Sequence, residues 1–251
     1  MLTSDKHHWH RFSAAYAEAL TRLGPVTRIL EFGVLRGDSV RWLRACYPAA
    51  EIHAADILAA DAVWPQDPQI HYHQLDQGDP AALTDLFTRL GPGLDLIIED
   101  GSHQPVHQAL CLRRGLPQLR RGGLYILEDI HTSHPSHPLA QAVAGAAREA
   151  GRRVEANALT LLLALQHLKD SGLPLSDDSQ TALSSPTFFA AADVRAIFEA
   201  LHAITLFRRA SLPLSCWSCG SAAFDYPALR CRCGTDLYAE ADSMTALLTR
   251  A

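Results

Sequence analysis

The chain has 251 residues, which is enough for one large α/β domain or for one domain with a small appendage, and 48% of them are apolar. Its formal net charge of -5 at pH 7 gives no electrostatic reason to expect nucleic acid or a membrane surface as a partner. No window approaches the length of a membrane span, and the first residues lack the apolar core of a signal peptide, so we expect a soluble cytoplasmic protein.

Strands alternate with helices over about the first half of the chain. An N-terminal helix is predicted over residues 4–24, with Ser4 or Asp5 as its N-cap and Gly24-Pro25 at its end. The strands are continuous apolar runs, which is typical of a parallel sheet covered on both faces. We therefore predict a Rossmann-like, doubly wound α/β fold with a mainly parallel sheet. The five strands are expected at 27–34, 51–57, 70–75, 94–100 and 122–129, and the helices between them at 38–47, 80–91 and 105–121.

The rest of the chain predicts further helices, one more strand and a change of composition. Apolar periodicity indicates helices at roughly 139–151, 155–171 and 191–201, and the Pro-, Ser- and Asp-containing stretch 171–186 between them is typical of a loop. Residues 200–210 are expected to form the last strand of the sheet. From Ser211 onward cysteines become frequent, so we divide the chain into a domain at 1–210 and a small C-terminal appendage at 211–251.

A glycine-containing loop joins the first predicted strand to the next helix. It has the pattern Glu31-x-Gly33-x-x-x-Gly37, whose glycines let the backbone turn sharply and approach a ligand closely. The Gly-x-Gly-x-x-Gly pattern of a dinucleotide site is missing, and an acid at the strand end suits a positively charged ligand better than a pyrophosphate. A tight turn without any ligand is the alternative interpretation.

Polar residues at the next two strand ends strengthen the prediction of a cofactor crevice. Asp56 stands roughly 20 residues past the loop, where an acid accepts hydrogen bonds from ribose hydroxyls. Asp76 and Gln77 follow the third strand and could recognise an adenine edge. An Asp in such a place is often only a helix cap, as we expect of Asp79 before Pro80.

Three acids end the fourth and fifth predicted strands. Since parallel strands present their carboxyl ends to one crevice, Asp100 should lie near Glu128 and Asp129. Three carboxylates repel one another unless a cation joins them, and oxygen ligands suit Mg²⁺, Mn²⁺ or Ca²⁺. His103, three residues past Asp100, is placed to take a proton. For each residue alone, a solvated strand end or a helix cap is the simpler explanation.

Nearby polar residues are assigned less specific roles. His107, one helical turn beyond His103, and His131 are expected to line the same pocket. Glu99 should point to the opposite side of its strand from Asp100 by simple alternation, so we leave it out of the metal site.

Four stretches carry a resemblance to a known family: SDKHHWHRFSAAYAEAL, LEFGVLRGDSV, LIIEDGSHQPVHQ and GGLYILEDIHTS. Together they resemble the metal-dependent sugar O-methyltransferases of antibiotic biosynthesis, the macrocin and mycinamicin O-methyltransferase type, over roughly residues 4–135. These enzymes are S-adenosylmethionine-dependent and Rossmann-like. Cephalosporin-hydroxylase-like proteins share a similar histidine after the fourth strand and are an alternative resemblance.

The family resemblance implies a role for each matching residue. It implies Mg²⁺ (or Mn²⁺) on Asp100, Glu128 and Asp129, with His103 as the base. It implies a hydroxylated small-molecule acceptor, a sugar or glycosylated natural product, and a possible homo-oligomer. Asp38 departs from the family, which often has glycine there, and the cysteines of the appendage are not a regular feature of it. The implied S-adenosylmethionine-binding residues are Glu31, Gly33, Gly37, Asp56, Asp76 and Gln77.

The four clustered cysteines predict a structural metal site. The sequence has Cys-x-x-Cys-Gly, eleven residues, and then Cys-x-Cys-Gly, which resembles a zinc ribbon whose second knuckle is one residue short. Four thiolates close the coordination sphere of Zn²⁺, and about 40 residues need such help to fold. Iron, or four unrelated thiols, are the alternatives. The predicted ligands are Cys216, Cys219, Cys231 and Cys233.

Three classes of function compete for the whole pattern. The leading one is an S-adenosylmethionine-dependent O-methyltransferase. A non-catalytic nucleotide-binding module with a zinc-ribbon interaction tail would give no reason for three carboxylates and a pocket histidine. An NAD-dependent oxidoreductase is disfavoured by the missing glycine pattern.

Overall fold

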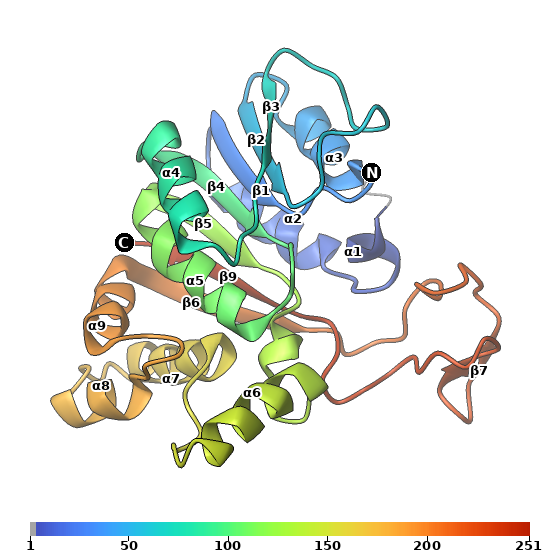
Figure 1. Ribbon diagram of the computed structural model, residues 1–251. Coiled ribbons are helices and arrows are strands. Elements are labelled where there is room, and N and C mark those ends of the chain that lie inside the picture. Colours follow the sequence, from blue (N-terminus) through green and yellow to red (C-terminus); the bar gives the residue numbers. More distant parts are fainter. Residues whose placement is uncertain (1–3) are drawn as a thin grey trace.

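A seven-stranded sheet lies between two layers of helices in the computed structural model, which describes residues 4–251 (Figure 1). The strand order is β3-β2-β1-β4-β5-β9-β6. The five strands from β1 to β5 run parallel, while β9 is antiparallel to both of its neighbours. The mainly parallel Rossmann-like sheet expected from the sequence is confirmed. Its strands are β1 Arg28–Phe32, β2 Glu51–Asp56, β3 Ile70–Gln74, β4 Leu94–Glu99, β5 Leu119–Leu127, β6 Leu201–Arg208 and β9 Met244–Arg250.

Two hydrophobic cores lie on the two faces of this sheet. Alternate residues of β4 divide between them, with Ile97 in one core and Leu96 and Ile98 in the other. The first core contains α4 (Pro80–Leu90), α5 (Pro105–Gly115), α7 (Ala158–Asp170) and α9 (Ala191–Ala200), and the second contains α2 (Ser13–Arg22) and α3 (Asp38–Cys46). A sheet apolar on both faces explains the continuous apolar runs of the sequence. Within residues 4–251, no helix combines the length and the apolar character that crossing a membrane would require.

The predicted N-terminal helix is broken into two. It forms the short α1 (Asp5–His8) and then α2, and between them Arg11 has a φ of 61°, which an α-helix does not allow. The break lets the chain turn, so that α1 comes to lie at the carboxyl ends of β4 and β5, where its Lys6 meets Asp100 and Glu128.

The stretch expected to be a loop, 171–186, contains the helix α8 (Asp177–Leu183). The Ser176 side chain caps it by accepting a hydrogen bond from the backbone N–H of Ser179. The negative charges of Asp177 and Asp178 in its first turn interact favourably with the positive end of the helix dipole. These residues are common in loops and in helix caps alike, which is why composition alone misled. Three further elements lie earlier in the chain, η1 Leu116–Gln118, η2 Ile130–Ser133 and α6 Pro138–Glu149.

The last strand differs most from expectation. The strand predicted over residues 200–210 exists as β6, but the chain returns after the cysteines to form β9, which pairs with β5 and β6. Residues 244–250 therefore belong to the main sheet. The cysteines lie in a segment inserted between two sheet strands, residues 211–243, hereafter the cysteine segment. It projects from the body as the orange and red arm of Figure 1 and holds only the two short strands β7 (Phe224–Asp225) and β8 (Arg230–Cys231).

Candidate active site

The carboxyl ends of β1, β4 and β5 bring the predicted acids together. The Asp100 N–H donates to the Phe32 carbonyl at the end of β1, and the Glu128 N–H donates to the Glu99 carbonyl at the end of β4. These bonds continue the parallel ladder by one residue at each strand end, so the side chains that follow meet in one crevice.

Lys6 lies in the middle of these acids, although no role was predicted for it. Its ammonium pairs with Asp100, lies 2.6 Å from Glu128 Oε1 and is 4.0 Å from Glu31 Oε1. Burial alone would lower the pKa of Lys6, but the three carboxylates together raise it well above its ordinary value. Burial and the charge of Asp100 raise the pKa of Glu128, and Lys6 opposes them. Lys6 is thus the charged partner of the buried Glu128 and the partly buried Asp100.

A second group of side chains shares Asp100. Asp100, His103 and Asp129 each offer a ligand atom, and these atoms lie within 4.8 Å of one another. His103 Nδ1 is 3.7 Å from Asp129 Oδ2 and 4.0 Å from Asp100 Oδ1. One oxygen of Asp100 thus faces Lys6 and the other faces His103. Of the metal ligands predicted from the sequence, Asp100 and Asp129 are brought together, whereas Glu128 is committed to Lys6.

Asp129 is surrounded by imidazoles. His10 Nδ1 and His131 Nδ1 lie 3.7 and 3.6 Å from its Oδ1, and His103 approaches Oδ2. Burial would raise the pKa of Asp129, but the three histidines together lower it. Burial likewise would lower the pKa of His103, while Asp129 and Asp100 raise it above its ordinary value. Asp129 Oδ1 is buried and makes no hydrogen bond among the described residues, so it is free to accept a cation.

Glu99 lies on the other side of β4, as alternation predicted, and holds Gln77. The Gln77 amide donates to Glu99 Oε1 at 2.6 Å, and its oxygen accepts from the Ser102 N–H at 2.9 Å. Gln77 therefore connects the loop before α4 to the end of β4. Its role at the adenine edge stays a prediction, and that role would require Gln77 to exchange these hydrogen bonds for bonds to adenine. His107 contacts Ser102 through Nδ1 at 2.9 Å and lies outside the carboxylate group.

The buried carboxylate of Glu99 predicts a pH-dependent cost to stability. Burial raises its pKa from 4.5 to about 7. Between those values the folded chain keeps a proton that the unfolded chain has released, so stability falls as the pH rises through this window, by roughly 3 kcal/mol in all. We expect Glu99→Gln to lose the part of this fall that Glu99 causes, while the part that Glu31 causes in the same pH range remains. The variant should unfold at higher urea than the wild type at about pH 8. Urea titrations at several pH values measure it.

Glu18→Gln is the control for that experiment, because Glu18 is an exposed helix residue paired only with Arg22. It should keep the pH dependence of the wild type. If Glu99→Gln keeps the full pH dependence of the wild type as well, Glu99 does not contribute to it.

The glycine loop has the form of a ligand cradle. Gly33 has a φ of 91°, and a Cβ there would overlap the Asp100 carbonyl oxygen; Gly37 has a φ of 76°. Only glycine is comfortable at such positions. Glu31 is fully buried below the loop and accepts a hydrogen bond from the Ser39 hydroxyl, while its Oε2 has no hydrogen-bond partner within residues 4–251. Burial raises the pKa of Glu31 to about 7. An unsatisfied buried carboxylate oxygen is what a cationic or hydroxyl-bearing ligand would complete.

The two remaining predicted cofactor residues lie at their strand ends, engaged with backbone. Asp56 Oδ2 accepts from the N–H groups of Val34 and Leu35, at 2.7 and 3.2 Å, and so shapes the glycine loop. Asp76 Oδ1 accepts from the Gly78 N–H at 2.7 Å, and the side chain is exposed. Their contacts with ribose and adenine stay predictions.

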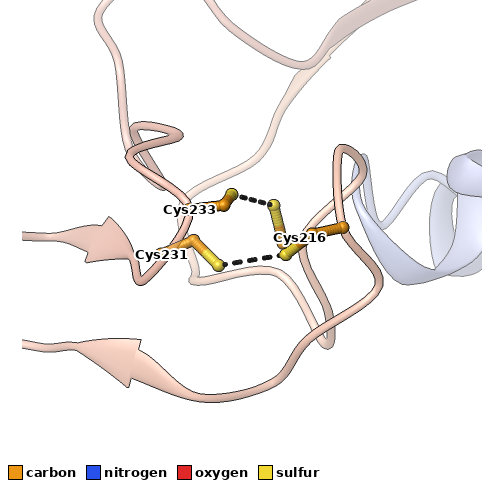
Figure 2. A group of neighbouring side chains, drawn as sticks. Cys216, Cys231 and Cys233 are labelled. Carbon is orange, nitrogen blue, oxygen red and sulfur yellow. Dashed lines mark hydrogen bonds between the residues drawn. The ribbon is translucent and has the colours of Figure 1, made fainter.

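The four predicted zinc ligands also gather, far along the chain from this crevice. Figure 2 shows Cys216, Cys231 and Cys233 around one centre, and Cys219 completes the group. All four sulfurs lie within 4.8 Å of one another.

Sequence reasoning missed two residues of the crevice, Lys6 and His10. A signal for Lys6 existed, since Lys6 and Lys169 are the only lysines among 22 basic residues. A lysine retained in a chain that otherwise uses arginine is a candidate for a site that a bulky guanidinium does not fit.

The strand order, the antiparallel β9 and the glycine loop above a buried acid define the class: the chain has the fold of the class I S-adenosylmethionine-dependent methyltransferases. Solved structures of MycE methyltransferase from the mycinamycin pathway, in complex with Mg and SAH, align with 95% of this chain and 49% of theirs, with a TM-score of 0.57 and 21% identity. That identity supports the fold alone.

Sequence relatives confirm the family resemblance. The chain is 36% identical over 140 residues to the 8-demethyl-8-alpha-L-rhamnosyl tetracenomycin-C 2'-O-methyltransferase of Streptomyces olivaceus, covering 52% of this chain and 36% of the relative. It is 33% identical over 114 residues to the mycinamicin VI 2''-O-methyltransferase of Micromonospora griseorubida, covering 43% and 28%. The match thus spans about a third of these relatives. No protein-family model matches the chain.

Proposed function

We propose that this protein transfers a methyl group from S-adenosylmethionine to a hydroxyl of a small molecule, with the help of a divalent cation. The observation that carries the proposal is the gathering of Asp100, His103 and Asp129 at the crevice next to the glycine loop. The sequence relationship to sugar O-methyltransferases supports it independently.

The crevice fits the sulfonium cofactor better than a dinucleotide. Glu31 offers a buried, unsatisfied oxygen below a loop whose glycines keep the backbone open. Negative charge beside the loop attracts a sulfonium or an amino group and repels a pyrophosphate. We assign cofactor binding to Glu31, Gly33, Gly37 and Asp56, with Asp76 and Gln77 as further candidates.

The site also fits a hard divalent cation. One oxygen of Asp129 is buried and makes no hydrogen bond among the described residues. The other Asp129 oxygen and one oxygen of Asp100 both face His103. Carboxylate oxygens are the ligands that Mg²⁺ and Mn²⁺ prefer. Asp100 and Asp129 would hold the cation, and Glu128 remains a candidate ligand if Lys6 moves. When bound, the cation supplies a Lewis acid that holds two vicinal hydroxyls and lowers their pKa.

The residues of the chain carry out positioning and proton transfer. The glycine loop places the activated methyl group, so the barrier falls chiefly through alignment of the methyl carbon with the acceptor oxygen. His103 takes the hydroxyl proton, and Asp129 beside it stabilises the imidazolium that forms.

Calorimetry and a transfer assay test this proposal. We expect S-adenosylhomocysteine to bind and NAD not to bind. With glycosides that carry vicinal hydroxyls, we expect label to move from methyl-labelled S-adenosylmethionine, to stop after EDTA treatment, and to return with Mg²⁺.

The opposite results would separate the competing functions. Binding of NAD alone would indicate an oxidoreductase, and binding without transfer to any glycoside would favour a nucleotide-binding module. Methyl transfer that EDTA does not affect would support the proposed methyltransferase activity but would exclude a role for the cation.

The names of the relatives support an acceptor class: they specify 2'-O-methylation of a rhamnosyl tetracenomycin and 2''-O-methylation of mycinamicin VI. We propose a glycosylated natural product or a related sugar as the acceptor, methylated in the cytoplasm. A cysteine cluster arranged for metal rather than for disulfides supports that location.

A further inference from the structure

The four cysteine sulfurs are spaced for a tetrahedral metal ion. Cys216 and Cys233 have their sulfurs 3.6 Å apart, and Cys219 and Cys231 have theirs 3.5 Å apart. Disulfide sulfurs would be about 2.05 Å apart. Zinc–sulfur bonds of about 2.3 Å in a tetrahedron place neighbouring sulfurs about 3.8 Å apart. The pairs join one knuckle to the other (Figure 2), as expected for four ligands around one centre.

The two knuckles have similar backbone turns. The Gly220 N–H donates to the Cys216 carbonyl at 2.8 Å, and the Gly234 N–H donates to the Cys231 carbonyl at 2.9 Å. Both glycines have positive φ, 71° and 94°. The glycine after each cysteine pair thus lets the chain fold back around the sulfurs.

The cysteine segment has almost no core of its own. Its buried apolar cluster consists of Cys216, Cys231, Leu237 and Trp9, and Trp9 comes from the other end of the chain. So small a cluster cannot order a 33-residue segment, residues 211–243, without a further link, and a structural metal supplies one.

Trp9 and its neighbours are where the cysteine segment meets the N-terminus. The Leu214 N–H donates to the His8 carbonyl at 2.7 Å. The Trp9 and Trp217 rings meet edge to face with centroids 6.5 Å apart, and Trp217 lies inside the first knuckle. The Arg209 guanidinium lies 4.8 Å from the centre of the Trp9 ring. Trp9 is therefore held between the first knuckle and the root of the segment.

Both ends of the cysteine segment reach the same place. Arg209 donates to the Leu237 carbonyl at 2.9 Å and pairs with Asp242 at 2.6 Å, which ties the entry of the segment to its exit. At that exit, the Ser243 hydroxyl lies 3.0 Å from His10 Nδ1. His10 in turn is 3.7 Å from Asp129.

We propose that Cys216, Cys219, Cys231 and Cys233 bind one Zn²⁺, and that the zinc-loaded segment fastens residues 5–12 onto the active site. Those residues carry Lys6 to Asp100 and Glu128 and carry His10 to Asp129. Loss of zinc then loosens a stretch of chain that completes the crevice, although none of these four cysteines touches the crevice among the described residues. The proposal rests on these contacts and is independent of which reaction the crevice performs.

Zinc analysis combined with hydrogen exchange tests both halves of the proposal. We expect one zinc per chain in the full-length wild type and none in Cys219→Ser, whose side chain is exposed. Amide exchange in residues 5–12 should rise on the order of tenfold in the variant, while exchange in β1 and β4 stays unchanged. Cys46→Ser, an exposed cysteine outside the group, is the matched control and should keep both zinc and protection.

Each result decides one half. Zinc retained by Cys219→Ser, or iron in place of zinc, overturns the metal site. Zinc lost with unchanged exchange in residues 5–12 overturns the fastening. If Cys219→Ser does not fold, removal of zinc from the wild type with a chelator and its return should raise and then restore the same exchange rates. None of these readouts depends on methyl transfer.

Discussion

Replacing His103 with asparagine is expected to lower turnover by about 10²–10⁴-fold while leaving the affinity for S-adenosylhomocysteine unchanged. The imidazole stands beside Asp129 at the crevice and is the group placed to take the acceptor proton. It lies outside the glycine loop, so cofactor binding should not depend on it. Asparagine is preferred to alanine because His103 has a φ of 55°, a conformation that asparagine tolerates well. Single-turnover methyl transfer and calorimetry provide the two measurements.

The control for this experiment is His71→Ala, which removes an exposed histidine on β3 that pairs with Glu51 away from the crevice. It should retain wild-type turnover. A fully active His103→Asn protein would contradict the assignment of the base. Equal losses of turnover and of cofactor affinity would instead indicate that His103 positions the cofactor.

The crevice could be predicted because it follows from strand direction. Continuous apolar runs imply parallel strands, and parallel strands deliver their last residues to one edge. Asp100 and Asp129 were therefore placed together without knowledge of any side-chain contact, and alternation along β4 placed Glu99 on the other side. The local sequence pattern was sufficient to place these residues because each parallel strand of the fold ends at the same edge of the sheet.

What could not be predicted depends on contacts between distant parts of the chain. Lys6 is 94 residues from Asp100 and 122 from Glu128, and no local pattern indicates that a lysine in a helix of four residues will be buried among acids. The strand β9 follows the cysteine segment, and its membership of the sheet depends on pairing with β5 and β6 rather than on its own short apolar run. The ion pair between Glu128 and Lys6 was not foreseen for the same reason, and the assignment of Glu128 as a metal ligand stays a prediction.

Replacing Lys6 with methionine is expected to destabilise the protein by roughly 3–5 kcal/mol at neutral pH, because it leaves the buried Glu128 and the partly buried Asp100 without their cation. Asp100 and Glu128 both contact the Lys6 ammonium, and Glu128 is almost completely buried. Methionine preserves most of the side-chain volume, so the change tests charge rather than packing. Urea unfolding in zinc-containing buffer measures the difference.

The pH dependence of this variant distinguishes charge from packing. Burial and Asp100 already raise the pKa of Glu128, and loss of Lys6 removes the group that opposes them. When the pKa of a carboxyl is higher in the folded state than in the unfolded state, protonation of that carboxyl stabilises the folded state. The stability lost in Lys6→Met should therefore return in part as the pH falls below neutral. Adding Glu128→Gln to Lys6→Met should recover part of the loss at neutral pH as well, since one buried charge is then gone.

Lys169→Met provides the matched comparison, because Lys169 is the only other lysine and lies over the Phe198 ring near the surface. It should cost less than about 1 kcal/mol at every pH. If Lys6→Met were no more destabilising than Lys169→Met, the carboxylates would have to be neutral, or already compensated by another cation, in the folded protein. If its loss were large but independent of pH, the role of Lys6 would be packing of α1 against the sheet ends rather than neutralisation of Asp100 and Glu128.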